Sequence, residues 1–329
     1  MSDIQLTVAR EEWPLARPFI IARGPQKVTS VIVVTLTDGA LRGRGECEPQ
    51  DHYGESAESV VAQIEAIRSS LQSGITRATL QTLLPAGAAR NAIDCALWDL
   101  EAKRRSMSVW ELAGLSRPES VLTNFTISLD TPAAMQTQAK EYRDWPVLKL
   151  KLGGDAEDLL RVRAVHEALP ATRLTIDANE SWSLEQLEAM APQLAGLGVE
   201  LIEQPLPAGQ DDALGDYAGP LPLCADESCH TRESLPSLRG RYAFINIKLD
   251  KTGGLTEALR LAEAGQEQGF RLMTGCMTGT SLAMAPATLV ASLSEFVDLD
   301  GGLLLRRDRP FAMTCHLGRL ESPIADLWG

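Results

Sequence analysis

The sequence is poor in the residues that build histidine or cysteine sites. Only four histidines occur in 329 residues, so a histidine-based metal site or catalytic triad has little material. The six cysteines are scattered and include no C-x-x-C pair, which predicts reduced thiols in place of a zinc site or disulfide framework. No apolar run approaches the ~18 residues of a membrane helix. The opening "MSDIQLTVAREEW" lacks a basic head followed by an apolar stretch. We therefore expect a cytoplasmic protein.

Positive charge is also in deficit. The chain has 31 Lys and Arg against 44 Asp and Glu, a formal net charge of -13. This balance argues against nucleic acid or an anionic membrane as a partner, and favours a small molecule. A hydrophobic content of 44% is ordinary for a globular chain that buries a sizeable core. Assembly into a homo-oligomer stays open at this point.

The first 115 residues and the remainder have different patterns. Two β-rich runs flank Asp38-Gly39, which predicts an antiparallel hairpin, and helices are expected from Ser56 to about Gln72 and over 88–105. From about residue 121, short apolar strands alternate with helices. Among the helix starts, Thr131 precedes a proline and Ser183 opens a capping box.

The expected strand ends recur at a near-constant period. From the second strand onward, successive ends are 22 to 27 residues apart, about one βα unit per step. Eight such strands predict a parallel (β/α) barrel. The expected ends are Thr126, Lys151, Asp177, Glu203, Asp226, Lys248, Gly275 and Asp300.

Charged residues end five consecutive strands of this predicted barrel. One charged strand end is usually an ordinary strand-to-loop transition, but the strand ends of a barrel converge on one mouth, where active sites lie. Three of the five are carboxylates, Asp177, Glu203 and Asp226, and they would repel each other without a cation between them. Hard oxygen ligands without histidine select Mg²⁺. We therefore predict one magnesium ion held by these three residues.

Lysines flank the predicted metal site. The strand "PVLKLKLGG" places Lys149 and Lys151 on one face and its leucines on the other. Taken alone, this pattern is also typical of an edge strand whose lysine face is in solvent. Lys151 and Lys248 end strands two and six, so they should face each other across the barrel. A substrate carboxylate on the metal would then present its α-carbon between two amines, and the metal would stabilise the enediolate formed when the α-proton leaves. Positive charge from Lys149 and the metal would lower the pKa of Lys151.

These motifs together resemble the enolase superfamily, in its muconate-lactonizing subgroup. The resemblance implies an α/β fold with a modified (β/α)7β TIM-type barrel over 116–304. It also implies an α+β capping domain over 1–115, completed by 305–329. It makes Lys151 and Lys248 the catalytic pair, with Lys251 structural or solvent-facing. The motifs are Lys149-Leu150-Lys151, Asp177-Ala178-Asn179, Glu203-Gln204-Pro205, Ala225-Asp226-Glu227-Ser228 and Asn246 to Gly254.

Within that subgroup the chain is most similar to dipeptide epimerases. The distinguishing motif is Asp298-Leu299-Asp300, two carboxylates suited to the free ammonium group of a dipeptide. The resemblance implies epimerisation of L-Ala-D-Glu and L-Ala-L-Glu, with Lys151 serving the D-configured and Lys248 the L-configured substrate. Such an activity suggests recycling of peptidoglycan-derived peptides.

Further residues follow from the same resemblance. Thr126, Lys149 and Cys276 are expected to contact substrate, and Cys276 could instead be a small buried residue. Arg23, with Lys27 as a competitor, is expected to bind a side-chain carboxylate of the substrate. Asn179 and Glu227 are expected to orient a metal ligand and a lysine. His52 and Tyr53 are possible lid contacts outside the chemistry.

Other reactions are possible on this scaffold. They are o-succinylbenzoate synthesis, N-acylamino acid racemisation and cycloisomerisation. The synthases usually have a proline where this chain has Leu249, and their substrate has no ammonium group for the Asp298-x-Asp300 pair. A non-catalytic binding protein would be expected to have lost at least one charged strand end, and all five are present.

Overall fold

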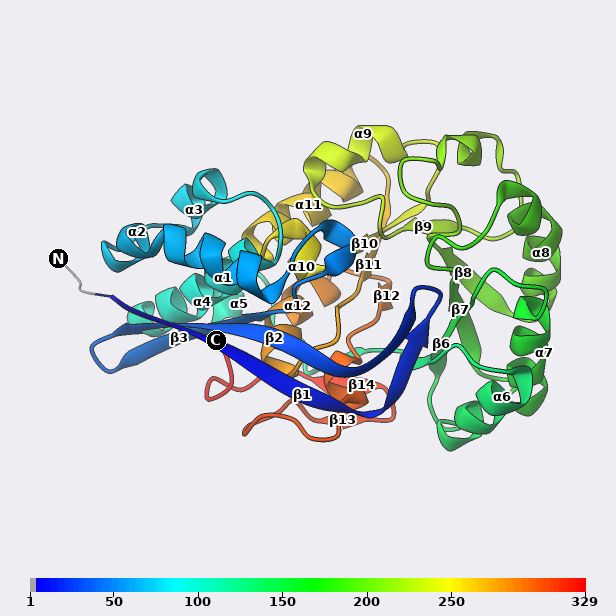
Figure 1. Cartoon of the computed structure of the whole chain (residues 1–329), viewed down its shortest axis with the longest axis horizontal. Helices are drawn as coiled ribbons and strands as arrows, with labels where there is room; N and C mark the ends of the chain where they lie inside the picture. The colour runs from blue at the N-terminus through cyan, green and yellow to red at the C-terminus, as the bar shows by residue number, and fades with distance from the viewer. Residues whose placement is uncertain (1–3) are drawn as a thin grey trace.

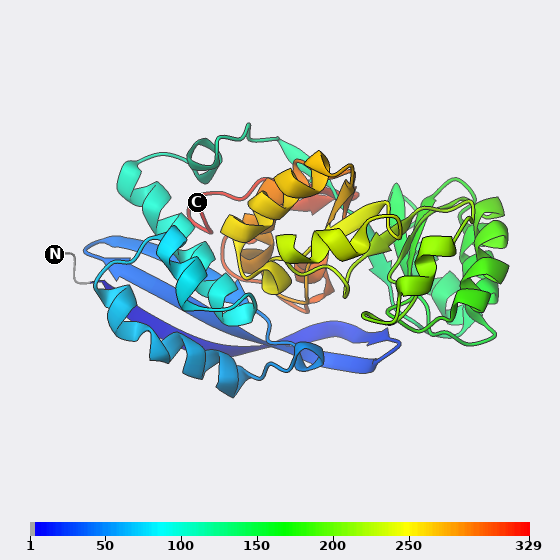
Figure 2. The ribbon, with the colours of Figure 1, turned by 90° about the horizontal axis from the view of Figure 1, so that it is seen from above.

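The computed structural model describes residues 4–329 (Figure 1). It begins with a three-stranded antiparallel sheet of β1 (Gln5–Ile21), β2 (Gly24–Asp38) and β3 (Leu41–Cys47). β2 and β3 meet at the predicted Asp38-Gly39 turn. The far ends of β1 and β2 form a long hairpin that reaches from this sheet to the rest of the molecule, as Figure 2 shows. Its tip carries Arg23.

Helices cover one face of this sheet. α4 runs over Ala88–Arg105, as predicted, and packs so closely on β3 that a Cβ at Gly45 would lie 2.1 Å from the Ala92 carbonyl oxygen. The helix expected from Ser56 to Gln72 is interrupted at Ile67, which has φ -107° and ψ 13°. The remaining elements here are η1 (Asp51–Tyr53), α1 (Ala57–Ala66), α2 (Arg68–Gln72), α3 (Arg77–Leu83) and α5 (Val109–Ala113).

Eight parallel strands form the barrel, in the order β5 to β12, so the predicted fold is confirmed. The barrel closes where Asn124, directly before β5, donates its backbone N–H to the Val297 carbonyl oxygen of β12 at 3.0 Å. The strands are β5 (Phe125–Ile127), β6 (Val147–Lys151), β7 (Arg173–Asp177), β8 (Val199–Glu203), β9 (Leu223–Ala225), β10 (Phe244–Ile247), β11 (Arg271–Thr274) and β12 (Phe296–Val297).

Helical segments connect these strands on the outside of the barrel (Figure 1). The predicted starts hold, because Thr131 and Ser183 each cap the helix that follows by accepting a backbone N–H. The α-helices are α6 (Pro132–Glu141), α7 (Asp158–Ala168), α8 (Leu184–Gly196), α9 (Leu235–Leu238), α10 (Leu249–Thr252), α11 (Leu255–Glu267) and α12 (Ser281–Ala291). The 3-10 segments are η2 (Asp212–Asp216), η3 (Arg232–Ser234) and η4 (Gly301–Leu304).

Several strand ends differ from the prediction. The strand expected to end near Thr126 is two strands, and the first, β4 (Ser120–Leu122), pairs with β14 (Arg319–Glu321) instead of entering the barrel. β14 also pairs with β13 (Cys315–His316). Asp226, Lys248, Gly275 and Asp300 follow their strands instead of ending them, because the chain turns directly into loops or helices there. Lys248, for example, is the N-cap of α10.

The C-terminal segment returns to the N-terminal part of the chain. Trp328 is buried and donates its indole N–H to the Cys95 carbonyl oxygen at 3.1 Å. Arg306 N–H donates to the Pro14 carbonyl oxygen at 2.9 Å. The division into 1–115, 116–304 and 305–329 stays a prediction. In the part of the chain that the structure describes, no helix combines the length and apolar character needed to cross a membrane.

Buried carboxylates join the N-terminal part to the barrel. Asp250 in α10 accepts hydrogen bonds from Asn91 Nδ2 at 3.0 Å and from the Glu48 backbone N–H at 3.1 Å. Burial raises the pKa of Asp250 to about 8. Glu46 pairs with Arg309 Nη2 at 2.7 Å. The Asp250 contacts hold α4 and the loop after β3 against the barrel, and the Glu46 contact holds β3 against the C-terminal segment.

Candidate active site

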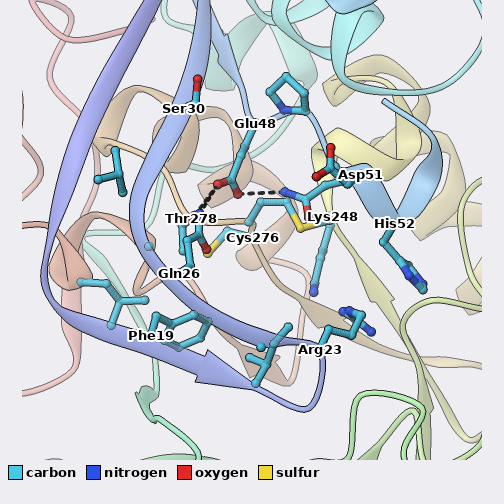
Figure 3. A pocket seen from close by; sticks show the side chains of 18 of the residues that line it. Phe19, Arg23, Gln26, Ser30, Glu48, Asp51, His52, Lys248, Cys276 and Thr278 are labelled. Carbon is cyan, nitrogen blue, oxygen red and sulfur yellow. Dashed lines mark hydrogen bonds between the residues drawn. The ribbon is translucent and has the colours of Figure 1, made fainter. Parts of the chain in front are cut away.

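A cavity of about 860 Å³ lies between the β1–β2 hairpin, the loop after β3 and the mouth of the barrel (Figure 3). Eight of the predicted site residues line it together with His52, so segments far apart in the chain converge here. They are Arg23, Thr126, Lys151, Asn179, Lys248, Cys276, Asp298 and Asp300. The other predicted site residues are buried behind this lining. They are Lys149, Asp177, Glu203, Asp226 and Glu227.

The three predicted metal ligands converge. Asp177 ends β7, Glu203 ends β8 and Asp226 follows β9, and each offers a carboxylate oxygen within 4.8 Å of the others. All three are buried. Two further buried oxygens, Asn179 Oδ1 and Glu227 Oε2, have no hydrogen-bond partner among residues 4–329, as is common where a ligand or water completes a site. This set of hard oxygen donors fits Mg²⁺.

The charges of this cluster are strongly coupled. Burial and the negative charge of Asp177 raise the pKa of Glu203 to about 8. Burial opposes ionisation of Asp177 as well, but the ammonium groups of Lys151 and Lys149 outweigh it and lower the pKa of Asp177. Carboxylates this close stay ionised together only with cations among them.

The two predicted catalytic lysines contact different carboxylates of this cluster. Lys151 Nζ donates to Asp177 Oδ2 at 2.6 Å, and Lys248 Nζ donates to Asp226 Oδ2 at 2.6 Å. They project from β6 and from the residue after β10, four strands apart in the sheet order. Burial lowers the pKa of Lys248, but Asp226 and Glu203 outweigh it and raise that pKa well above its usual range.

Lys149 lies deeper than the sequence pattern suggested. It does not line the cavity, and its Nζ lies 2.7 Å from Glu203 Oε2, 2.7 Å from Asp298 Oδ2 and 3.1 Å from Asp177 Oδ2. Direct repulsion of Lys151 was expected, but Asp177 Oδ2 contacts both ammonium groups and offsets it. Lys149 thus contacts carboxylates of the cluster, and its contact with substrate stays a prediction.

Lys251 is buried. Of the two predictions for this residue, a solvent-facing position is therefore wrong, and a structural role agrees with its contacts. Its Nζ donates to Asp226 Oδ1 at 2.5 Å and to the Asn246 carbonyl oxygen at 3.1 Å. Asp226 is thus bound by Lys251 on one oxygen and by Lys248 on the other. Asn246 also donates its side-chain Nδ2 to Glu203 Oε1 at 2.8 Å. Two residues outside the predicted set therefore orient predicted metal ligands.

The two aspartates after β12 are held by the first barrel strand. Thr126 donates its backbone N–H to Asp300 Oδ2 at 2.7 Å and its hydroxyl to Asp298 Oδ1 at 3.4 Å. Burial and the neighbouring charge of Asp298 raise the pKa of Asp300 to about 7. Nearby, burial raises the pKa of the Cys276 thiol, which stays protonated. The pair can accept hydrogen bonds from a cationic or amide nitrogen in the cavity.

The hairpin tip contributes Arg23 to the cavity. Its Nη1 donates to Glu227 Oε1 at 2.9 Å and to Glu180 Oε2 at 3.2 Å. Glu227 also accepts a 3.4 Å hydrogen bond from Asn179 Nδ2. His52, expected to be a lid contact only, lies with its Nε2 2.9 Å from Glu180 Oε2. Glu180 was missed, although it directly follows the Asp177-Ala178-Asn179 motif.

A second missed residue, Glu48, lines the cavity below the hairpin. Its carboxylate accepts hydrogen bonds from Gln26 at 2.8 Å, Thr278 at 2.5 Å and Gln50 at 2.9 Å, some of them drawn in Figure 3. Among the described residues it has no cationic partner, and burial raises its pKa. No spacing in the sequence distinguishes this glutamate from a surface one, since its partners come from three separate segments.

Two family models match the chain. Residues 134–306 match the model described as enolase C-terminal domain-like. Residues 3–114 match the model of the mandelate racemase / muconate lactonizing enzyme N-terminal domain.

Curated relatives match nearly the full length. An L-Ala-D/L-Glu epimerase of Escherichia coli is 48% identical over 318 residues, which cover 95% of this chain and 98% of the relative. An N-acetyl-D-glutamate racemase of a Pseudoalteromonas species is 45% identical over 302 residues, with 91% and 95% covered.

Solved structures are similar as well. An enolase family member from Agrobacterium tumefaciens with homology to dipeptide epimerases, with bound sodium and L-Ala-L-Glu, has a TM-score of 0.97 and 46% identity. That similarity covers 99% of this chain and 100% of the other. A Methylococcus capsulatus dipeptide epimerase in complex with Mg and L-Arg-D-Lys has a TM-score of 0.90 and 31% identity, with 98% and 97% covered.

Proposed function

The chain belongs to the mandelate racemase and muconate lactonizing enzyme family of the enolase superfamily, and from this premise we propose that it epimerises dipeptides. The reaction is a Mg²⁺-dependent 1,1-proton transfer at the α-carbon of the C-terminal residue. The preferred pair is L-Ala-D-Glu and L-Ala-L-Glu, since a relative of that activity is 48% identical over 95% of this chain.

The observation that carries this proposal is the pair Lys151 and Lys248 on one cavity. Each lysine contacts a different carboxylate of the acidic cluster, and the two come from strands four positions apart. An α-carbon held between them is within reach of an amine on each face. Removal of a proton by one lysine and delivery by the other inverts the centre.

Asp177, Glu203 and Asp226 would hold the metal ion. When bound, Mg²⁺ supplies positive charge that stabilises the enediolate formed as the α-proton leaves the substrate. Lys151 removes the proton from the D-configured substrate and Lys248 from the L-configured one, each as the neutral amine, which for Lys248 requires that the bound metal offset the charge of Asp226 and Glu203. Each amine, once protonated, is the acid for the opposite direction.

The cavity also offers groups for both ends of an acidic dipeptide. Asp298 and Asp300, held by Thr126, accept hydrogen bonds from the substrate ammonium group. Arg23 lines the cavity from the hairpin and binds the side-chain carboxylate. Glu227 orients Arg23 by accepting its hydrogen bond, and Asn179 in turn donates a hydrogen bond to Glu227. With this substrate, the enzyme would serve the cytoplasmic recycling of peptidoglycan-derived peptides, and a homo-oligomer is compatible with that role.

Proton NMR in D₂O tests the proposal directly. The protein is incubated with Mg²⁺ and L-Ala-L-Glu while the glutamate α-proton signal is followed. Loss of this signal together with new L-Ala-D-Glu resonances is the expected result. Exchange without the epimer would mean that one lysine is misassigned, and the absence of both would refute the proposed substrate.

A second candidate is racemisation of an N-acyl glutamate, the reaction named for the Pseudoalteromonas relative. Lys149 already neutralises Asp298 at 2.7 Å, and burial keeps the pKa of Asp300 near 7. The pair therefore has less free negative charge than two exposed aspartates and could accept an amide N–H. The same exchange assay with N-acetyl-L-glutamate distinguishes the two functions.

A further inference from the structure

Glu180 lies between two loops of the N-terminal part at the edge of the cavity. Its Oε2 lies 3.2 Å from Arg23 Nη1 on the β1–β2 hairpin and 2.9 Å from His52 Nε2 in η1. Its Oε1 accepts the Ala208 backbone N–H at 2.8 Å. The Glu180 side chain is 13% exposed, against 36% for both Arg23 and His52. One carboxylate of the barrel thus joins two loops that lie over the site.

The backbone around Glu180 is held in an unfavourable conformation. Asn179 has φ +42° and Glu180 has φ +67°, in the left-handed region that glycine and asparagine tolerate but glutamate rarely adopts. The Glu180 N–H donates to the Gln204 carbonyl oxygen at 2.8 Å, and Gln204 itself has φ +33°. This turn directly follows the predicted metal ligand Asp177. Such strain persists where the surroundings determine the conformation, and here it directs the Glu180 side chain to the hairpin tip.

Only one amino group of Arg23 is occupied by protein partners. Nη1 donates to both Glu180 and Glu227, whereas among residues 4–329 neither Nη2 nor Nε has a hydrogen-bond partner. A guanidinium group binds a carboxylate through two neighbouring N–H groups. Anchoring Nη1 on the barrel therefore leaves an edge of Arg23 available for a ligand carboxylate in the cavity.

We propose that Glu180 is a positioning residue that sets the preference for an acidic side chain in the substrate. It holds Arg23 so that its free edge meets the side-chain carboxylate, and it holds the His52 loop beside it. The inference rests on the proposed function and assigns the origin of its specificity. The negative charge of Glu180 opposes a second carboxylate nearby, but it is shared among Arg23, His52 and the Ala208 N–H. Orientation of Arg23 is the larger effect.

The test compares Glu180→Ala and Glu180→Gln with Glu188→Ala. Glu188 is an exposed acid on α8 with no hydrogen bond or ion pair from its side chain in the described structure, so it is a matched control. Epimerisation is measured with L-Ala-L-Glu and with L-Ala-L-Gln, which has a similar size but no charge. Binding of both dipeptides is measured by calorimetry, independently of turnover.

For Glu180→Ala we expect KM and Kd for L-Ala-L-Glu to rise about tenfold, since a charge-assisted hydrogen bond is lost. The kcat should change by less than about threefold, because Glu180 does not touch the reacting atoms. Values for L-Ala-L-Gln should not change. Glu180→Gln keeps an acceptor for Arg23 and should recover most of the loss, and Glu188→Ala should match the wild type.

Three results would overturn the inference, two of them from the Glu180 variants and one from the wild type. An equal rise of KM for both dipeptides would mean that Glu180 only stabilises the loops. A lower KM for L-Ala-L-Glu in both Glu180 variants would mean that Glu180 competes with the substrate for Arg23. If the wild type binds L-Ala-L-Glu but exchanges no α-proton, the proposed function fails. The Kd values from calorimetry would then still test the role of Glu180 in binding. Wild-type protein that binds neither dipeptide would overturn both.

Discussion

Replacing Lys149 with methionine removes a cation from the centre of the acidic cluster and keeps an unbranched side chain of similar length. The Lys149 ammonium group lies 2.7 Å from Glu203, 2.7 Å from Asp298 and 3.1 Å from Asp177. Burial lowers its pKa, but these three carboxylates outweigh burial and raise that pKa well above its usual range, so Lys149 stays charged. Lys149→Met therefore leaves three buried carboxylates without their shared partner.

The size of the effect follows from the burial of the pairs. Removing one partner of a buried ion pair costs about 3–5 kcal/mol, because the other charge stays buried and unpaired. Lys149 is 1% exposed, and Asp177 and Glu203 are equally buried, so the full penalty applies. We expect the unfolding free energy of the metal-free variant to be about 3–5 kcal/mol lower than that of the wild type.

Magnesium should reverse part of this loss. Two of the three carboxylates that contact Lys149 are predicted metal ligands, Asp177 and Glu203, so the lysine and the ion supply charge to the same groups. Without the lysine, the affinity for Mg²⁺ should rise by about tenfold or more, equivalent to about 1.4 kcal/mol. An ion present at about 100 times its Kd adds about 2.7 kcal/mol to stability.

Urea unfolding followed by circular dichroism, in EDTA and in excess Mg²⁺, measures both effects, and calorimetry measures the Mg²⁺ affinity. Lys27→Met is the matched control, because Lys27 is exposed and its side chain has no hydrogen bond or ion pair in the described structure. A variant as stable as the wild type in EDTA, with an unchanged Mg²⁺ affinity, would refute the assigned charge balance.

Three further outcomes are expected. Lys151→Ala should abolish epimerisation but retain slow α-proton exchange of L-Ala-L-Glu through Lys248, measured by NMR in D₂O; an epimerising variant would contradict the two-base mechanism. Dialysis against EDTA should remove both exchange and epimerisation, and added Mg²⁺ should restore them. Asp250 has a folded pKa of about 8 against an ordinary value of 3.8, so between these values the native state holds a proton that the unfolded chain has lost. Stability should therefore fall as pH rises from 6 to 8, by about 1.4 kcal/mol per unit for this one group, and Asp250→Asn should flatten the decrease in urea unfolding curves.

The sequence predicted the elements whose signals are local. A capping serine such as Ser183 predicts a helix start from residues next to it in the chain. The period of the βα units predicted eight strands in their order along the chain. Because parallel strands of a barrel end at one mouth, the same period predicted that Asp177, Glu203 and Asp226 lie together, as they do in the structure. The strand at the first barrel position was mispredicted, since β4 pairs with a segment almost 200 residues further along.

Depth within the barrel and contacts between distant segments were decided only by the tertiary structure. Lys149 and Lys151 share a strand face and look equivalent in the sequence, yet one contacts three buried carboxylates and the other lines the cavity. The sequence likewise left open whether Lys251 is buried or faces solvent. Glu180 gained its partners Arg23 and His52 through the hairpin and η1, both more than 100 residues away in the chain. Alternation and period therefore determined which residues face the mouth, whereas the packing of the cap against the barrel determined their partners and charges.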